Sequence, residues 1–201
     1  AWEAKTTLAA QVGVTTDSRN IHFFDASVAN KLASFTFANL NSAGKGAYFQ
    51  NVCSMAQPLS QCPEITALGA TELANANSGT NLVNYLRGRK AFEDIAGNTD
   101  DARLFRGRNT PLGDLVNAAP VYVKKPPFRY GDAGYAEFAA ANAGRTGVVY
   151  AAANDGMLHA FNAATGQELW AFVPSAVLPN LYRLADRNYA TSHRYFVDGT
   201  P

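Results

Sequence analysis

The residues whose side chains could carry out acid–base chemistry are few and lie far apart in the chain. The three histidines are His22, His159 and His193. A general base needs a partner within hydrogen-bond reach, and the local sequence supplies none for any of them. His159 alternates with apolar neighbours, so we expect it to be a packed or rim residue of a strand. The sequence predicts no catalytic constellation.

The acidic and amide side chains are better explained by turns than by catalysis. Asp155 precedes a glycine in a tight turn, where an aspartate usually bonds its own backbone. Asp114 and Asn117 are expected to cap turns where a β-rich region begins. The run 98–101 (NTDD) comes nearest to a metal-binding sequence, but it lacks the alternating oxygen ligands and the glycine of a calcium loop. We therefore predict no catalytic, cofactor-binding or metal-ligating residue in this chain.

Two cysteines, Cys53 and Cys62, lie nine positions apart in a segment that also holds Pro58 and Pro63. Residues alone leave two alternatives open, a disulfide bond or two reduced, buried thiols. An even number of cysteines favours the disulfide only in an oxidising compartment. A zinc site is not expected, because no histidine lies nearby in the sequence.

Composition excludes two classes of partner. The 201 residues carry a formal net charge of +1, and 16% of them are charged, so no basic surface for nucleic acid is expected. The most basic stretch, 87–108, is interpreted as a solvated face or loop. No run approaches the roughly 18 apolar residues that a membrane-spanning helix needs.

The strongest structural pattern lies in residues 147–173. Asn154–Gly156 and Ala163–Gln167 are turn sequences at hairpin spacing, and Gly166 is the expected left-handed residue of the second turn. Three short antiparallel strands joined by tight turns are predicted. Such a meander makes up most of one blade of a β-propeller.

Hydrophobic patterns predict further elements. Strands are expected over 7–14, 20–24, 32–37, 115–116, 121–123 and 193–197, and helices over 65–75, 81–88, 135–142 and 175–186. Gly88 should end the second of these helices. The helix at 135–142 falls between two strands and is expected to be an insertion above the propeller. Propellers often close with an N-terminal strand, so residues 1–50 are expected to supply edge strands to a blade beyond Pro201.

Five segments resemble known families. Residues 155–170 resemble the repeat of quinoprotein-type propellers at Asp155, Gly156, Thr165, Gly166 and Trp170. Residues 112–123 (LGDLVNAAPVYV) look like the LGDIVNSSPVYV segment of the PilY/PilC family of type IV pilus tip-associated proteins. Residues 84–88, 172–181 and 193–201 are similar to that family too, so the resemblance covers about residues 80–201.

The resemblance implies a secreted, non-enzymatic protein that promotes pilus assembly and acts as a tip adhesin. Implied partners are pilus subunits (minor pilins) and a host surface or receptor, and the implied location is extracellular, reached through the periplasm and outer membrane. In that compartment Cys53 and Cys62 are predicted to pair. The implied role of Trp170 is to pack against the neighbouring blade, and the family's calcium loop, if present in the parent, is expected beyond Pro201.

The fold class expected is mainly β with helical insertions, a partial β-propeller of quinoprotein-like blades and a fragment of a larger one. A complete propeller needs at least four blades of about forty residues, and only one blade is recognisable here. Residues 1–110 are assigned to N-terminal strands, the cysteine-containing insertion and a polar connection, and 111–201 to the first blade region. Two alternatives remain, a quinone-dependent dehydrogenase and a scaffold for outer-membrane assembly. Adjacent cysteines would favour the former, and tandem repeats the latter.

Overall fold

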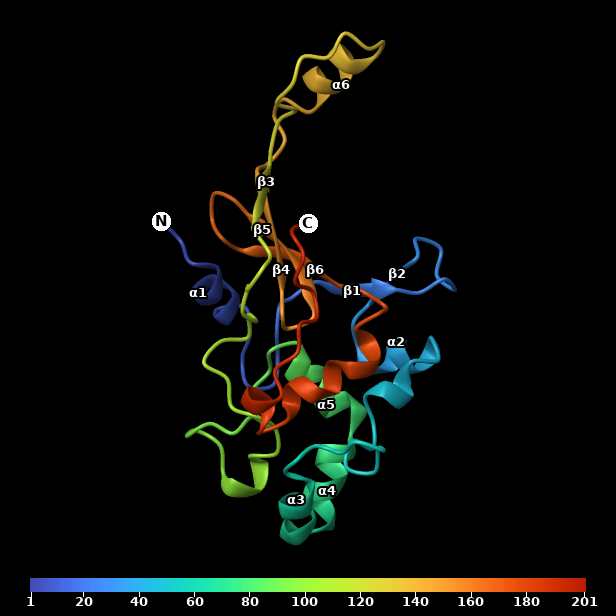
Figure 1. Cartoon of the computed structure of the whole chain (residues 1–201), viewed down its shortest axis with the longest axis vertical. Coiled ribbons are helices and arrows are strands. Elements are labelled where there is room, and N and C mark those ends of the chain that lie inside the picture. The colour runs from blue at the N-terminus through green and yellow to red at the C-terminus, as the bar shows by residue number, and fades with distance from the viewer.

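One mixed β-sheet of six strands organises the chain, and the computed structural model describes all of residues 1–201 (Figure 1). The strands lie in the spatial order β2-β1-β6-β5-β4-β3. They are β1 (Ile21–Phe24), β2 (Leu32–Ser34), β3 (Val121–Val123), β4 (Val148–Ala153), β5 (Met157–Asn162) and β6 (Glu168–Val173).

The predicted meander of residues 147–173 is confirmed by β4, β5 and β6, which pair as antiparallel neighbours. Gly156 in the first turn has φ 88° and Gly166 in the second has φ 74°, both in the left-handed region that favours glycine. Asn162 holds the second turn, because its Oδ1 accepts the amide protons of Ala164 at 2.9 Å and Thr165 at 3.2 Å. With β3 beside β4, four antiparallel strands follow one another in chain order, as in a propeller blade.

The first strand does not reach beyond this sheet. β1 pairs in parallel with β6, with Ile21 opposite Ala171 and Phe23 opposite Val173, and β2 then adds as an antiparallel neighbour of β1. The expectation that the N-terminal strands complete a blade lying beyond Pro201 is therefore wrong for this structure.

Helices contain more residues than strands, so the expected mainly β class is corrected to a mixed α/β fold with one open sheet. The α-helices are α1 (Ala4–Ala9), α2 (Phe37–Ser42), α3 (Cys62–Leu68), α4 (Ala70–Asn77), α5 (Gly79–Leu86) and α6 (Tyr135–Ala141). Four 3₁₀ turns, η1 (Gly46–Tyr48), η2 (Asp100–Ala102), η3 (Leu178–Ala185) and η4 (Tyr189–Thr191), complete the secondary structure.

Several helix predictions hold with changed bounds. The single helix expected at 65–75 is two helices, because Gly69 adopts φ 147° between α3 and α4. The helix predicted at 81–88 is α5, capped by the Ser78 side chain and followed by Gly88 at φ 108°. The helix expected at 175–186 is the 3₁₀ helix η3, and the one at 135–142 is α6.

Three strand predictions are wrong. Residues 7–14 begin within α1, whose Leu8 is fully buried, and alanine and leucine favour helix where the chain packs across the end of β6. Residues 115–116 and 193–197 form no strand. In the second segment the backbone is bonded by side chains instead, Arg194 by Tyr189 and Phe196 by Asn154. The strand expected at 32–37 ends at Ser34, where α2 soon begins.

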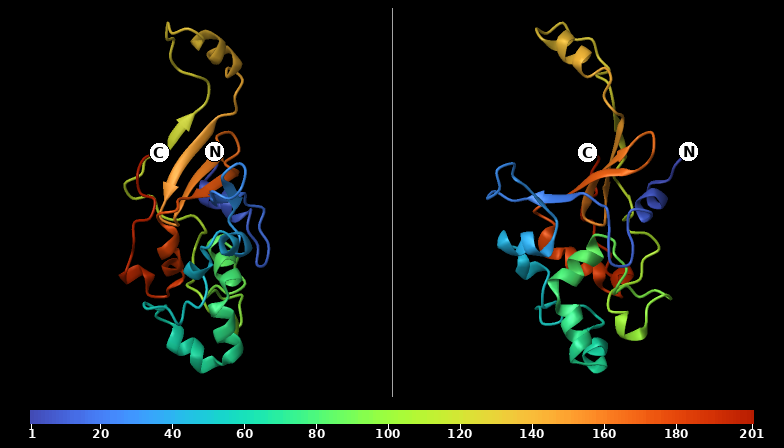
Figure 2. Two further views of the ribbon diagram at one scale, coloured as in Figure 1. Left: turned by 90° about the vertical axis from the view of Figure 1, so that its right-hand side faces the viewer. Right: turned by 180° about the vertical axis from the view of Figure 1, so that it is seen from behind.

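The main core lies between one face of the sheet and the helices packed below it (Figure 2). Ile21, Phe23 and Val173 point into it from the strands, and η3 and α5 pack against each other on its far side. Aromatic rings extend the core toward α2, with Phe35 edge-on to Phe49 at a centroid distance of 5.8 Å. Burial of these side chains is the main source of stability of this half of the molecule.

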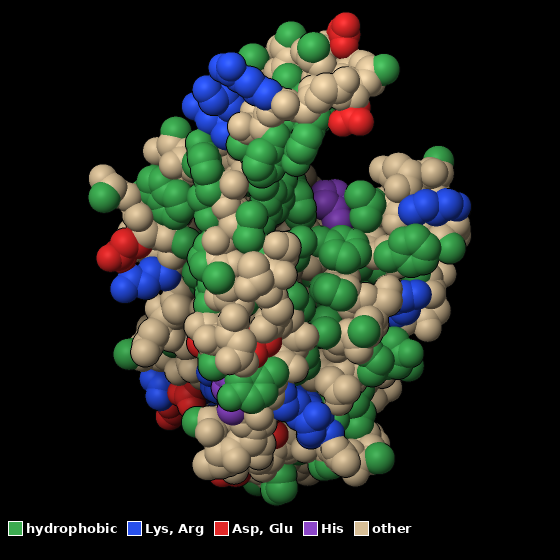
Figure 3. Space-filling model, turned by 45° about the horizontal axis from the view of Figure 1, so that its top comes forward, with side chains coloured by type: hydrophobic (Ala, Val, Ile, Leu, Met, Phe, Trp, Pro, Cys, Tyr) green, Lys and Arg blue, Asp and Glu red, His purple; other side chains and the backbone are tan.

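The opposite face of the sheet is apolar and lacks a covering layer. Cross-strand partners share a face, so Tyr150, Ala160 and Trp170 lie together, and next to them Leu158, Phe172 and His22. We call these six residues the open face. A groove of about 380 Å³ runs along it, bordered also by Leu32. Figure 3 shows apolar side chains gathered around a hollow with a histidine at its edge.

An arm projects from the sheet between β3 and β4 and carries α6 at its tip (Figure 1). Its base is held by Arg145, which donates from Nε to the carbonyl oxygen of Lys124 at 2.7 Å. At its tip Tyr130 and Tyr135 lie edge to face at 5.0 Å. The predicted position of α6, inserted between two strands of one blade, is confirmed.

The predicted disulfide between Cys53 and Cys62 is present, with Cα atoms 5.3 Å apart. It ties the loop before α3 to the first residue of that helix. None of the helices is both long enough and apolar enough to cross a membrane.

Candidate functional site

A chain of four charged side chains is buried beneath the first turn of the meander. Arg19 donates from Nε to Glu168 Oε2 at 2.7 Å and from Nη2 to Oε1 at 2.8 Å. His159 Nδ1 lies 2.7 Å from Glu168 Oε1, and its Nε2 lies 3.1 Å from both carboxylate oxygens of Asp155. These four side chains therefore link Arg19, which precedes β1, with the neighbouring strands β5 and β6 and with the turn between β4 and β5.

These contacts keep both central groups ionised. Burial alone would lower the pKa of His159, but the carboxylates of Asp155 and Glu168 outweigh it and raise that pKa to about 9. Burial would likewise raise the pKa of Glu168, but hydrogen bonds and charges from His159 and Arg19 lower it to about 2. At neutral pH the His159 imidazolium and the Glu168 carboxylate coexist as a bonded pair, and His159 has no lone pair to offer as a base.

The prediction that His159 has no acidic partner is wrong, although its placement as a packed strand residue is correct. Asp155 is four residues away in the chain, across a turn, and Glu168 lies on the adjacent strand. The turn signal that placed Gly156 also brings Asp155 back over His159, so this partner could have been found from the hairpin. The second partner, Glu168, could not have been found, because its position depends on the bulge between β5 and β6.

Asp155 and Asp114 connect the meander to the loop before β3. The amide of Gly113 donates to Asp155 Oδ2 at 3.1 Å, and a side chain at Gly113 would meet the backbone nitrogen of Asp155 at 2.2 Å. The amide of Asn154 donates to the carbonyl oxygen of Asp114 at 3.0 Å, and His193 Nε2 lies 3.1 Å from Asp114 Oδ2. Burial would raise the pKa of Asp114, but the bonds from His193 and Asn154 lower it. The LGD motif is thus a docking element for the turn.

The loop before β3 also contacts the end of the chain. Asn117 donates its amide proton to Asp198 Oδ1 at 2.9 Å, and Ala119 donates to Thr200 Oγ1 at 3.0 Å. Two of the segments that carry the resemblance to pilus proteins therefore lie side by side, although they are about 80 residues apart in the sequence. Asn117 was expected only to cap a turn, and this pairing had no signal in the sequence.

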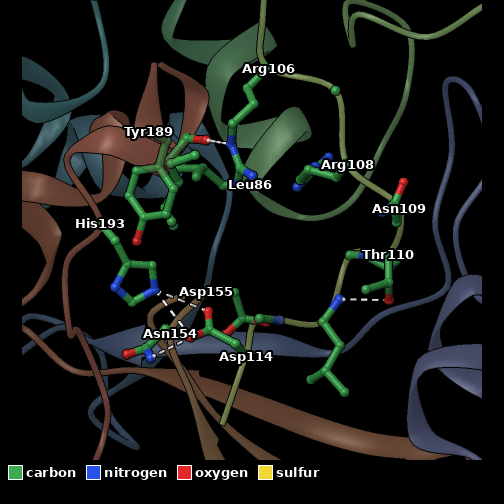
Figure 4. Close-up of a pocket in the computed structure, with 16 residues that line it drawn as sticks. Leu86, Arg106, Arg108, Asn109, Thr110, Asp114, Asn154, Asp155, Tyr189 and His193 are labelled. Atoms are coloured by element: carbon green, nitrogen blue, oxygen red, sulfur yellow. Dashed lines mark hydrogen bonds and ion pairs between the residues drawn. The ribbon is translucent and has the colours of Figure 1, made fainter. Parts of the chain in front are cut away.

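A pocket of about 350 Å³ lies where these segments meet (Figure 4). Asp114, Asp155 and His193 form one side of it, and Arg106 and Arg108 approach from the other. The guanidinium of Arg106 reaches toward the open middle in Figure 4. Charged groups of both signs line the pocket. The charge of the ligand that it can bind therefore depends on which of these groups are already paired within the protein.

The basic stretch 87–108 is only partly the solvated loop that its composition suggested. Arg87 is buried and ion-paired with Asp17, and its Nη1 donates to the carbonyl oxygen of Phe35 at 3.0 Å. Arg108 donates from Nε to Glu93 Oε1 at 3.0 Å, and its guanidinium carbon lies 3.7 Å from the centre of the Tyr85 ring. Arg87 binds the end of α5 to the N-terminal segment, and Arg108 packs the connection against Tyr85 of α5.

The remaining candidate residues have structural positions. Asp100 lies in η2 and pairs with Arg103 at 3.2 Å. Thr165 and Gly166 form the second meander turn, and Trp170 on the open face lies 5.9 Å from Tyr150, centroid to centroid. No three His, Cys, Asp or Glu side chains of the chain come together in a group that could hold a metal ion.

The consecutive antiparallel strands, the repeat residues at their turns and the docked LGD segment define part of a β-propeller domain. Residues 112–201 match the family model described as the PilY1 beta-propeller domain. Residues 112–201 are therefore a segment of a PilY1-type propeller domain, and the chain is similar to type IV pilus biogenesis factors of that name.

Three relatives illustrate the similarity. The chain is 46% identical over 139 residues to a type IV pilus biogenesis factor PilY1 homolog of Xylella fastidiosa, an alignment that covers 66% of this chain and 11% of that protein. It is 39% identical over 131 residues to PilY1 of Pseudomonas aeruginosa strain PAK, covering 61% of this chain and 11% of the relative. With PilY1 of strain UCBPP-PA14 it shares 31% identity over 194 residues, 92% of this chain and 14% of the relative.

The chain thus spans a small part of the length of the relatives it matches. No solved structure matches the chain at a comparable level of significance.

Proposed function

We propose that this chain is a non-enzymatic scaffold segment of a type IV pilus biogenesis factor, acting outside the cell at the pilus. Its role is to supply one blade and to present a surface on which the next sheet of the propeller packs. The supporting observations are the match of residues 112–201 to the PilY1 propeller domain and the buried charges around His159, which bond one another and leave no paired nucleophile and base.

The observation that best supports this proposal is the open face of the sheet. The other face of the same sheet is covered by the chain's own helices, whereas Trp170, Tyr150 and Phe172 remain only partly buried. A sheet face with large apolar side chains and no covering layer is completed by packing against another sheet. Trp170 is the largest side chain there, and we assign to it the role of contacting the neighbouring blade.

The test is a substitution in the full-length parent protein of a piliated bacterium. Replacing Trp170 with Ser should reduce surface pili and twitching motility, because the propeller would lose its blade contact. Leu68→Ser is the matched control, since Leu68 is 50% exposed at the end of α3, away from the sheet. Wild-type piliation with Trp170→Ser, in protein present at normal levels, would contradict the assignment.

Pilus subunits, above all minor pilins, are the proposed partners, and a host surface is the proposed target if the parent acts as an adhesin. The quinone-dependent dehydrogenase is less well supported, because Cys53 and Cys62 are bonded across a loop and are not neighbours in sequence. An assembly scaffold of the outer membrane is less well supported too, since the similar proteins carry the name of a pilus factor.

A further inference from the structure

Arg106 is the one arginine or carboxylate lining the pocket of Figure 4 that has no ion-pair partner. Arg108 is paired with Glu93, and Asp155 with His159. Asp114 is held by His193 and Asn154. Protein charges that are removed from bulk water are normally compensated by an opposite charge. Arg106 is half-buried and lacks that compensation.

The position of Arg106 is fixed by the protein. Its Nε donates to the carbonyl oxygen of Leu184 at 2.9 Å, and its guanidinium carbon lies 4.8 Å from the centre of the Tyr189 ring. Its backbone is held as well, since its amide donates to Ala185 and its carbonyl accepts from Tyr85 Oη. The two terminal nitrogens, Nη1 and Nη2, make no hydrogen bond within the chain and remain available to a ligand.

An oriented guanidinium with two free terminal nitrogens matches the geometry of a carboxylate, which can accept two parallel hydrogen bonds. The charge of the pocket also selects among anions. One uncompensated positive charge suits an anion with a single negative charge, and the ionised Asp114 on the opposite side disfavours a dianion such as phosphate.

We propose that this pocket is a binding site for a carboxylate presented by a peptide, with Arg106 as its anchor. Two sources share this chemistry, an aspartate or glutamate side chain and the C-terminus of a chain. The pocket is large enough for a side chain of this size, at about 350 Å³. The inference is independent of the proposed role of the open face, which lies on the other side of the sheet.

The experiment is a titration of the 201-residue chain, followed by the ¹H–¹⁵N NMR signals of the Arg106 side chain and of the Gly107 amide. The probes are acetate, a peptide with one aspartate and both ends blocked, a peptide with a free C-terminus and no acidic side chain, and inorganic phosphate. Acetate and at least one peptide should shift these signals, and the peptide that binds identifies the source of the carboxylate.

Variants separate the site from general attraction of anions. Arg106→Gln should weaken binding by about tenfold or more, the size expected for losing charge-assisted hydrogen bonds. Arg106→Lys keeps the positive charge but lacks the two parallel donors of the guanidinium, so it should weaken carboxylate binding less than Arg106→Gln does. Arg129→Gln, at an exposed arginine of the arm, should leave binding unchanged.

Four outcomes would overturn the proposal. They are no shift with any carboxylate, binding of acetate but of neither peptide, tighter binding of phosphate than of the peptides, and binding that survives in both Arg106 variants. Because Arg106→Gln removes the bond to Leu184, the variant's spectrum must first show a folded chain. If the Arg106→Gln chain is unfolded, Arg106→Lys and the four probes test the proposal in its place.

Discussion

His159 and Glu168 face each other across β5 and β6, with 2.7 Å between Nδ1 and Oε1, and both side chains are fully buried. Neither residue is available to solvent, and each owes its charge to the other and to one further partner. The pair joins the two strands of the meander to Arg19 and to the turn at Asp155. The stability of this part of the molecule should therefore depend on pH.

The first prediction concerns that pH dependence. The pKa of His159 is raised from 6.5 to about 9, so its stabilising effect should be complete below pH 6.5 and lost as the pH rises through 9. The pKa of Glu168 is lowered from 4.5 to about 2, so its effect should be complete above pH 4.5 and lost as the pH falls through 2. The loss on the alkaline side should be on the order of 3 kcal/mol.

Urea unfolding across the pH range measures this dependence, and NMR titration of the His159 ring reports its pKa directly. Glu168→Gln should cost about 3–5 kcal/mol, because it leaves the buried Arg19 without its carboxylate. Glu137→Gln, at an exposed position of α6, is the matched control. A pKa of His159 near that of an exposed histidine would contradict the prediction.

The second prediction concerns Gly113. A Cβ atom there would lie 2.2 Å from the backbone nitrogen of Asp155, so Gly113→Ala must push the LGD segment away from the turn. The expected cost is about 1–3 kcal/mol in the free energy of unfolding, as for other overpacked sites. Gly144→Ala serves as the control, because no atom lies within 4 Å of its added Cβ. Equal stabilities of the two variants would show that the segment does not dock on the turn as described.

The third prediction concerns the disulfide. Replacing both Cys53 and Cys62 with Ala should lower the free energy of unfolding by about 2–3 kcal/mol, since a short loop is freed in the unfolded chain. Thiol titration of denatured, unreduced wild-type protein should detect no free thiol. Two titratable thiols would exclude the bond, and an unchanged free energy of unfolding in the double variant would exclude its stabilising effect.

Local patterns in the sequence were sufficient where a structural element depends on neighbours in the chain. The turns at Gly156 and Gly166, the three strands they join and the end of α5 before Gly88 all follow from residue types within a few positions. Helix α6 follows for the same reason. The PilY/PilC resemblance could be recognised because it rests on contiguous motifs.

Contacts between distant segments had no comparable signal. The pairing of Arg19 with Glu168, the docking of Gly113 on Asp155 and the position of Arg106 under Leu184 each join parts of the chain that only the fold brings together. At residues 7–14 the alternating pattern predicted a strand, but residues 7–9 belong to α1, whose alanine and leucine favour helix. The candidate site is made almost entirely of such contacts, so the sequence predicted its turn and not its pocket.

The parallel pairing of β1 with β6 has a consequence for the order in which the chain can fold. Ile21 meets Ala171, so the edge of β1 that faces away from β2 has no partner until β6 has been synthesised. The β4–β5–β6 meander can form quickly from adjacent residues, whereas β1 must close a loop of most of the chain length before it pairs with β6. Until then this second edge of β1 stays exposed to other chains. Protection from aggregation is therefore needed most between synthesis of β1 and synthesis of β6.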